Sequence, residues 1–276
     1  MSTGHPWRRL LVGVCCALAV TAAAADGQPA SPPVIALIID DLGDRLDAGS
    51  RAIELPGQLT YAILPRTPYS RRLAELAHGA GKEVMLHQPM QAINGRAMGP
   101  GGMDMVMSQR ALLDTLEANL ASVPHARGVN NHMGSLLTRH PGHMGWLMAA
   151  LRERGNLYFI DSTTTNKTVA QQIAVEHELP TMRRQVFLDH HREERQILKQ
   201  FVRLLRLAHS NGYALGIGHP YPETLAVLQK VLPHLEGFGV RLVPASELIT
   251  HKEKRREQLW HASLSPLPKG VKSLKR

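Results

Sequence analysis

The sequence has 276 residues, of which 43% are hydrophobic, 20% are charged and only 4% are aromatic. This composition is sufficient for one large globular domain and excludes a mostly disordered chain. The low aromatic content argues against stacking platforms for single-stranded nucleic acid. The formal net charge of +9 comes mainly from the two ends, and the body between them is close to neutral. We therefore expect no nucleic-acid partner, because such a domain carries its basic face on the fold itself.

The first 25 residues have the three parts of a secretory signal peptide. Met1–Arg9 is short and positive, Leu10–Ala25 is apolar and uncharged, and small residues end the run. We predict cleavage near Ala25, export to the periplasm or the exterior, and a Pro-rich linker over residues 26–33. The alternative is an uncleaved anchor, although the apolar run is short for a membrane span.

Both cysteines of the sequence, Cys15 and Cys16, lie in this leader. After cleavage the chain would contain no disulfide, no thiol nucleophile and no thiolate ligand. Any metal must therefore be held by histidine and carboxylate side chains.

From Val34 onward, short buried-strand patterns alternate with amphipathic stretches of helical spacing. The predicted strands are residues 34–39, 59–64, 83–86, 128–131, 157–160, 185–188, 213–217 and 240–243. The clearest predicted helices are residues 70–78, 108–121, 144–154 and 194–210. On the last of these helices, the spacing predicts a core-facing stripe of Leu198, Val202, Leu205 and Ala208.

The regular strand–helix alternation predicts an α/β fold, a distorted (β/α) barrel of seven or eight strands over residues 34–250. A doubly wound open sheet is the alternative, but no G-x-G-x-x-G follows the first strand. The third connection contains a glycine-rich segment, residues 94–102, which we expect to be mobile. We predict a last helix to about Trp260 within a basic, partly disordered tail of residues 251–276.

Carboxylate, imidazole and amide side chains recur directly after the predicted strands. In a βα barrel these positions meet at the carboxyl-terminal rim, where active sites lie. The residues are Asp40 and Asp41, His87, Asn130 to His132, Asp161 and Ser162, Asp189 and His190, and His219. The repetition at successive strand ends is difficult to explain as ordinary turn chemistry.

The Asp40-Asp41 pair is the sharpest of these elements. Adjacent residues of an extended chain point to opposite sides, so one carboxylate can bind a metal while the other handles a proton. The alternative is a pair that caps the next helix. His132 follows two asparagines, which are costly to bury without a task.

The remaining rim residues each have a simple alternative. His87 fits a hydrogen-bonded structural histidine as well as a ligand. Asp161 fits either a helix cap or a residue that orients a metal ligand. His219 fits a general acid or a turn histidine, and the glycines beside it, Gly216 and Gly218, would allow close approach of substrate.

Five segments in order, IALIIDDLG, LHQPM, GVNNHMGS, FIDS and GIGHP, resemble the divergent polysaccharide deacetylase family of the NodB-like superfamily. The resemblance covers about Val34 to Ile249. It implies a distorted (β/α) barrel and a divalent metal, for which we expect zinc. It also implies that Asp40 is the general base, Asp41 is a metal ligand and His219 is the general acid.

The sequence departs from the NodB pattern at two places. NodB-type enzymes take two metal histidines from one H-x-x-x-H segment, whereas here His87 is followed four residues later by Gln91. We therefore nominate His132 as the second histidine ligand. The usual Arg-Pro-Pro segment is replaced by Asn130-Asn131-His132. The candidate substrate-binding residues are Asn130, Asn131, Asp161 and Ser162.

The favoured function is metal-dependent hydrolysis of an acetylated glycan, which would be the partner of the rim site. The rival is a catalytically inactive barrel that binds an envelope glycan or protein. A phosphoesterase is a third alternative, for which Arg66 is a rim candidate. We expect the basic tail to make at most weak contact with the envelope or a membrane surface.

Overall fold

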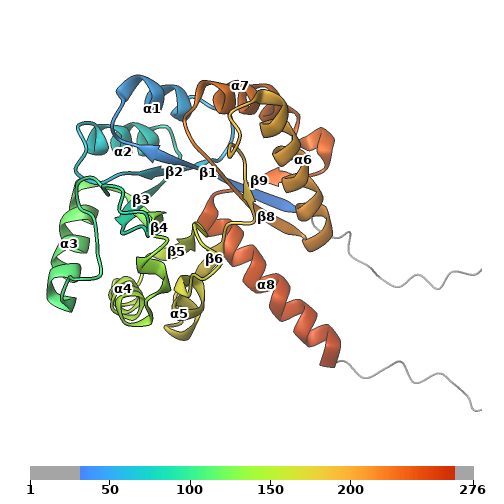
Figure 1. Cartoon of the computed structure of the whole chain (residues 1–276). Helices are drawn as coiled ribbons and strands as arrows, with labels where there is room; N and C mark the ends of the chain where they lie inside the picture. The colour runs from blue at the N-terminus through green and yellow to red at the C-terminus, as the bar shows by residue number, and fades with distance from the viewer. Residues whose placement is uncertain (1–31, 265–276) are drawn as a thin grey trace, which may run out of the picture. The chain divides into compact units, whose positions relative to one another are not determined.

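The chain folds into a repeat of alternating β-strands and α-helices (Figure 1). The computed structural model describes residues 32–264, so the predicted signal peptide, most of the linker and the end of the tail lie outside it. The strands of this range are β1 (Val34–Leu42), β2 (Thr60–Ile63), β3 (Glu83–Met90), β4 (Ala126–Met133), β5 (Tyr158–Asp161), β6 (Thr181–Arg183), β7 (Val186–Phe187), β8 (Tyr213–Gly218) and β9 (Arg241–Leu242). The α-helices are α1 (Leu46–Ile53), α2 (Ser70–Gly79), α3 (Gln109–Ser122), α4 (Pro141–Glu153), α5 (Ala170–Glu176), α6 (Glu194–Asn211), α7 (Pro222–Val231) and α8 (Ala245–Leu264).

The strands form one parallel sheet in the order β6-β5-β4-β3-β2-β1-β8-β7. Strand β9 lies off this path and pairs with the start of β1, at Val34 and Ile35, while β2 pairs with β1 from Ile38 onward. Eight parallel strands therefore curl into a half-barrel that is open between β6 and β7. This confirms the predicted distorted (β/α) barrel over the doubly wound sheet. The short strand β6 was not predicted.

Strand β1 is buried on both faces and divides the core into two layers. Ile35, Leu37 and Ile39 belong to the layer between the sheet and the surrounding helices. The alternating residues Val34, Ala36 and Ile38 belong to an inner layer, which the first turns of α8 fill. A parallel strand that is covered on both faces has a nearly continuous apolar sequence, as this strand does.

The inner layer is closed by residues of α8 rather than by the sheet alone. Ala245, Leu248 and Ile249 pack there against side chains of β1, β3, β5 and β8. The helix runs as one element through residue 250, where the predicted barrel domain gives way to the predicted tail. None of the helices within residues 32–264 is long and apolar enough to cross a membrane.

The predicted apolar stripe of helix α6 was wrong in part. The buried side chains are Ile197, Phe201, Leu204, Leu205 and Ala208, whereas Leu198 and Val202 are 44% and 37% exposed. The helix carries apolar residues around a wide arc, and two overlapping stripes share Leu205 and Ala208. The sheet buries the arc that contains Phe201, a choice that helical spacing alone does not determine.

The glycine-rich third connection is anchored where it returns to the sheet. The Met103 amide donates to the Pro89 carbonyl at 2.9 Å, and Gln88 and Asn119 both donate to the Gly101 carbonyl, at 2.9 and 2.8 Å. Gly101 has φ of +71°, and a Cβ there would collide with Asn119. The mobility expected for residues 94–102 is therefore restricted at this end and stays a prediction for the rest.

Candidate metal centre and catalytic site

A cavity of about 480 Å³ lies at the carboxyl-terminal ends of the strands. The rim residues predicted for the chemistry line it together: Asp40, Asp41, His87, His132 and His219. They come from β1, β3, β4 and the residue after β8, so strands far apart in the sequence bring them to one point. Arg66, the rim candidate for a phosphoesterase, does not line this cavity.

The two aspartates of β1 face the same cavity, contrary to the expectation that they point to opposite sides. Asp41 has φ of +60°, and the pairing of β1 with β2 shifts register between Ile39 and Leu42. This irregularity interrupts the alternation of an extended strand. Left-handed backbone at a non-glycine residue costs about 1–3 kcal/mol and occurs preferentially at functional sites.

Asp41, His87 and His132 form a triad of ligand atoms. Oδ1 of Asp41 lies 3.0 Å from Nε2 of His87 and 2.8 Å from Nδ1 of His132, and the two ring nitrogens are 3.1 Å apart. Ligands on a tetrahedral zinc ion with bonds of 2.0–2.1 Å would lie roughly 3.3 Å apart. The spacing of the triad is therefore close to that of three ligands around one small divalent cation.

The Asp41 carboxylate supplies a second indication that the triad fits a cation. Its Oδ1 is buried and makes no properly aligned hydrogen bond within residues 32–264, despite the two nearby ring nitrogens. A buried carboxylate oxygen in that position is costly unless a proton or a metal satisfies it. Gln91 takes no part, because its Oε1 accepts the Met105 amide at 2.9 Å.

The Asp41 carboxylate and the His87 imidazole of the triad shift each other's pKa in opposite directions. Burial raises the pKa of Asp41, but its contacts with His132 and His87 outweigh burial and place that pKa well below the ordinary value. Burial likewise lowers the pKa of His87, and the carboxylates of Asp40 and Asp41 outweigh it and raise that pKa to about 9. Metal binding at Nε2 of His87 therefore competes with protonation of the same ring.

Asn130 links a metal ligand to the candidate base. Its Oδ1 accepts from Nδ1 of His87 at 2.7 Å, and its Nδ2 donates to Oδ1 of Asp40 at 2.8 Å. The bond holds the Nδ1–H tautomer of His87 and leaves the Nε2 lone pair for a metal. Asn130 is fully buried and does not line the cavity, so it supports the site rather than contacting substrate.

Asp40 lies beside the triad without belonging to it. Its Oδ2 is 3.7 Å from Nε2 of His87, and the residue is almost completely buried. Burial raises the pKa of Asp40, and the nearby His87 and His219 only partly offset this effect. A carboxylate with a raised pKa is a better proton acceptor, because a general base works best when its pKa approaches the working pH.

His219 is held from behind by Asp189. Oδ1 of Asp189 accepts from Nδ1 of His219 at 2.9 Å, while Oδ2 accepts the His219 backbone amide and the Thr224 hydroxyl. Burial lowers the pKa of His219, but the Asp189 hydrogen bond and charge outweigh burial and raise it. Nε2 of His219 faces the centre, 3.8 Å from Oδ2 of Asp41.

Asp189 was predicted to lie at the rim but was given no role in the site. It directly follows the predicted strand 185–188, at the same point of its unit as Asp40 and Asp41. Its role depends on β7 lying next to β8, which brings it to His219.

The other predicted substrate-binding residues divide into two groups. Asn131 and Ser162 line the cavity, and Oδ1 of Asn131 accepts the Ser162 amide at 2.9 Å. Asp161 is fully buried and accepts the Thr163 amide and the Thr168 hydroxyl, so it caps the loop beneath the cavity. Asp161 does not cap α5, whose N-cap Val169 makes no side-chain cap, and its burial separates it from substrate.

The glycines near His219 serve packing rather than substrate approach. A Cβ on Gly216 would press into Leu37 and Leu204 beneath α6, and one on Gly218 would lie 3.3 Å from Oδ2 of Asp189. Neither glycine lines the cavity. Their small size lets β8 come close to α6 and to the carboxylate that holds His219.

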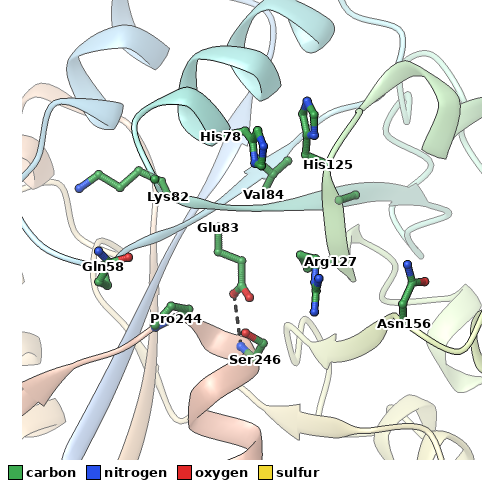
Figure 2. A pocket seen from close by; sticks show the side chains of 12 residues that line it. Gln58, His78, Lys82, Glu83, Val84, His125, Arg127, Asn156, Pro244 and Ser246 are labelled. Carbon is green, nitrogen blue, oxygen red and sulfur yellow. Dashed lines mark hydrogen bonds between the residues drawn. The ribbon is translucent and has the colours of Figure 1, made fainter.

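A larger cavity, about 660 Å³, lies at the amino-terminal ends of β3 and β4. Figure 2 shows Glu83 pointing toward Ser246, and the exposed His78 and His125 lie side by side with stacked rings. Oε1 of Glu83 accepts from Thr60, Tyr158 and the Ser246 amide, which ties α8 to the sheet. This end of the barrel is a stabilising network, as expected for the face opposite an active site.

The sequence comparisons agree with these observations. Residues 37–249 match the family described as divergent polysaccharide deacetylase. The chain is 34% identical over 248 residues to the uncharacterised protein YibQ of Escherichia coli K12, covering 90% of this chain and 75% of that protein. It is 37% identical over 201 residues to an uncharacterised protein of Haemophilus influenzae, covering 73% and 71%.

Two solved structures support the fold. The uncharacterised protein ATU2773 from Agrobacterium tumefaciens C58 superposes with a TM-score of 0.76 at 24% identity, covering 80% of this chain and 91% of that one. The peptidoglycan deacetylase PdaC from Bacillus subtilis superposes with a TM-score of 0.52 at 15% identity, covering 85% and 98%. The family match, the relatives and the barrel together show that this chain belongs to the divergent polysaccharide deacetylase family, whose fold is related to that of the NodB-type deacetylases.

Proposed function

We propose that the protein is a metal-dependent hydrolase that removes acetyl groups from a carbohydrate. The observation that carries the proposal is the triad of Asp41, His87 and His132, with its buried and unsatisfied Asp41 Oδ1. Two nitrogen ligands and one carboxylate oxygen suit zinc, and three protein ligands leave room for water and substrate. A divalent metal held there supplies a Lewis acid that polarises the acetyl carbonyl and makes water more acidic.

Asp40 and His219 perform the two proton transfers. Asp40 accepts the proton of the attacking water, because burial has raised its pKa and Asn130 holds its other oxygen. His219 donates a proton to the leaving amine or hydroxyl from Nε2, while Asp189 holds Nδ1–H. Both groups line the same cavity as the triad, so base and acid can reach the same acetyl group.

The catalytically inactive barrel is the alternative, and its main support was the incomplete H-x-x-x-H segment. The triad removes most of that support, because His132 on β4 provides an imidazole where Gln91 does not. The alternative remains the outcome that follows if the chain binds no metal.

The test compares zinc stoichiometry with deacetylase rate on acetylated glycans. Alanine at Asp41, His87 or His132 should remove metal and activity together while the fold persists. Asp40→Asn should keep the metal and slow hydrolysis by roughly 10²–10⁴-fold, the usual contribution of general-base catalysis. His219→Ala should also keep the metal and slow departure of the leaving group.

The experiment has a clear contrary result. If the wild-type protein binds no divalent metal at micromolar concentration, the enzyme proposal fails and the binding module takes its place. His177→Ala is a suitable control, because that residue lies at the end of α5 and outside the cavity.

We also propose that the protein acts outside the cytoplasm, where it would meet envelope glycans. The support is the charged, apolar and small-residue order of residues 1–25. Intact-mass analysis of the exported protein should give an amino terminus near Asp26. A full-length species retained in the inner membrane would instead favour an anchor.

A further inference from the structure

One arginine of the cavity is held rigidly and has a free edge. Nε of Arg184 donates to the Ser162 carbonyl at 2.7 Å, and Nη2 donates to the Thr163 carbonyl at 2.9 Å. The guanidinium also lies 4.7 Å from the ring centroid of Phe187. These contacts fix the plane of the group, while Nη1 makes no hydrogen bond within residues 32–264.

Arg184 has no carboxylate partner in the part of the chain that the structure describes. No Asp or Glu oxygen lies within 4.0 Å of it there, and only longer-range attraction from Asp40 and Asp161 acts on it. Burial lowers its pKa, although an arginine remains charged at neutral pH. A half-buried cation without a counter-ion is costly, so a ligand that brings the negative charge would be favoured.

The charge balance of the cavity points in the same direction. Its wall contains two arginines, Arg96 and Arg184, and two carboxylates, Asp40 and Asp41. These four formal charges cancel, and a divalent cation on the triad would leave the cavity positive. Neutral sugars gain nothing from that excess, whereas an anionic group would.

Ser162 adds an unsatisfied hydroxyl to the same wall. It lines the cavity, is 5% exposed, and its Oγ has no hydrogen-bond partner in the described residues. Its carbonyl is the group that holds Nε of Arg184. A buried donor beside an unpaired cation is typical of a site completed by a ligand oxygen.

We propose that Arg184, with Ser162 beside it and Arg96 on the same cavity wall, forms a subsite for a carboxylate on the acetylated glycan. This inference rests on the proposed function and adds the class of substrate, an acidic acetylated sugar. The free end of the guanidinium offers two N–H groups to one carboxylate. The planar fork of the guanidinium matches the two oxygens of a carboxylate.

The carboxylate can lie on the acetylated sugar itself or on its neighbour, and two substrates separate these sources. One is the disaccharide of N-acetylglucosamine and N-acetylmuramic acid, which carries its carboxylate on an acetylated sugar. The other is a tetrasaccharide that alternates N-acetylglucosamine with glucuronic acid. Chitobiose and chitotetraose are the neutral matches. We expect the wild-type zinc protein to favour at least one acidic substrate by about tenfold or more in kcat/KM.

Arg184→Gln should remove this preference. Loss of a hydrogen bond to a charged group should lower kcat/KM on the acidic substrate by roughly 10- to 100-fold, mainly through a higher KM. The ratio of kcat/KM for acidic and neutral substrates should therefore fall to about one. Arg206→Gln, on the exposed side of α6, removes the same charge elsewhere and should leave the ratio unchanged. An equal loss on acidic and neutral substrates would overturn the subsite, because Arg184 would then act on the reaction itself.

A binding measurement separates this inference from the proposed function. Saturation-transfer NMR on the metal-free protein should detect at least one of the two acidic sugars but neither neutral match, and Arg184→Gln should abolish the signal. The metal-free protein is used because a bound cation would itself attract carboxylates. If no substrate is hydrolysed and this selective binding persists, the proposed function fails and the subsite stands. If the wild type binds acidic and neutral sugars equally, or binds none of the four, the subsite is refuted.

Discussion

Asn130 contacts both His87 and Asp40, although it does not line the cavity. One amide group fixes the tautomer of the proposed metal ligand His87 and occupies one oxygen of the proposed base Asp40. Asp189 performs the equivalent task for the proposed acid His219. Each reacting group is therefore oriented by a buried neighbour, which lowers the cost of bringing it to the reacting geometry.

Asn130→Ala should weaken zinc binding by roughly 10- to 100-fold, the usual effect of removing a hydrogen bond behind a histidine ligand. Competition with a chromophoric chelator measures this change. Asn156→Ala, at an exposed asparagine near the opposite end of the barrel, is the control. An unchanged affinity would mean that packing alone orients His87.

Asp189→Asn should slow hydrolysis by roughly 10²–10⁴-fold while zinc affinity stays the same. It should also move the alkaline limb of the kcat profile to lower pH. The reason is that Asp189 raises the pKa of His219 against the opposing effect of burial, and a general acid works only while protonated. Activity is therefore present below this pKa and lost above it, and the limb follows the pKa downward when Asp189 is neutralised. A limb that stays in place would assign it to another group.

At the scale of elements, helix α6 shows how a sheet selects one face of an apolar helix. The outer layer of the core contains Ile197 and Phe201 but not Leu198 and Val202. The strand ends show the same dependence on context. Asp41, Met133 and Thr163 all have positive φ close to the cavity, so strand irregularities direct side chains into the site.

Ile197→Ala and Leu198→Ala form a matched pair on this helix. The first should reduce the free energy of unfolding by about 2–5 kcal/mol, because it leaves a cavity in the outer layer. The second should change that free energy by less than about 0.5 kcal/mol, because its side chain is partly solvated. Urea unfolding measures both. Equal losses would show that Leu198 is covered in solution.

For the whole molecule, the start of α8 completes a half-barrel that would otherwise expose its inner face. Leu248 and Ile249 fill that face, and Glu83 binds the Ser246 amide beneath it (Figure 2). The far part of the helix contributes less, since Leu259 and Trp260 are exposed. The helix therefore combines a core segment with a surface segment.

Leu248→Ala should lower the free energy of unfolding by about 2–5 kcal/mol, whereas deletion of residues 263–276 should leave Tm unchanged. Thermal unfolding of the two variants beside the full chain separates the two segments. A large loss of Tm on deletion would mean that the tail packs on the barrel.

Much of the fold and part of the site could be predicted from the sequence, because both depend on local patterns. Period-two and period-3.6 hydrophobicity indicate strands and helices, and a polar residue directly after a buried strand lies at the rim of any parallel barrel. This logic located Asp41, His87, His132 and His219 before their distances were known. It also located Asp189 at the rim without indicating its partner.

The remaining features depend on contacts between segments far apart in the chain. The shared direction of Asp40 and Asp41 depends on a left-handed residue inside a strand, which no hydrophobic period encodes. Asn130 became a support rather than a substrate contact because β3 places His87 opposite it. The sequence by itself determined which residues reach the rim, since position along a strand is local. Only the tertiary structure decided which of them touch, because register and backbone irregularity arise when the sheet assembles.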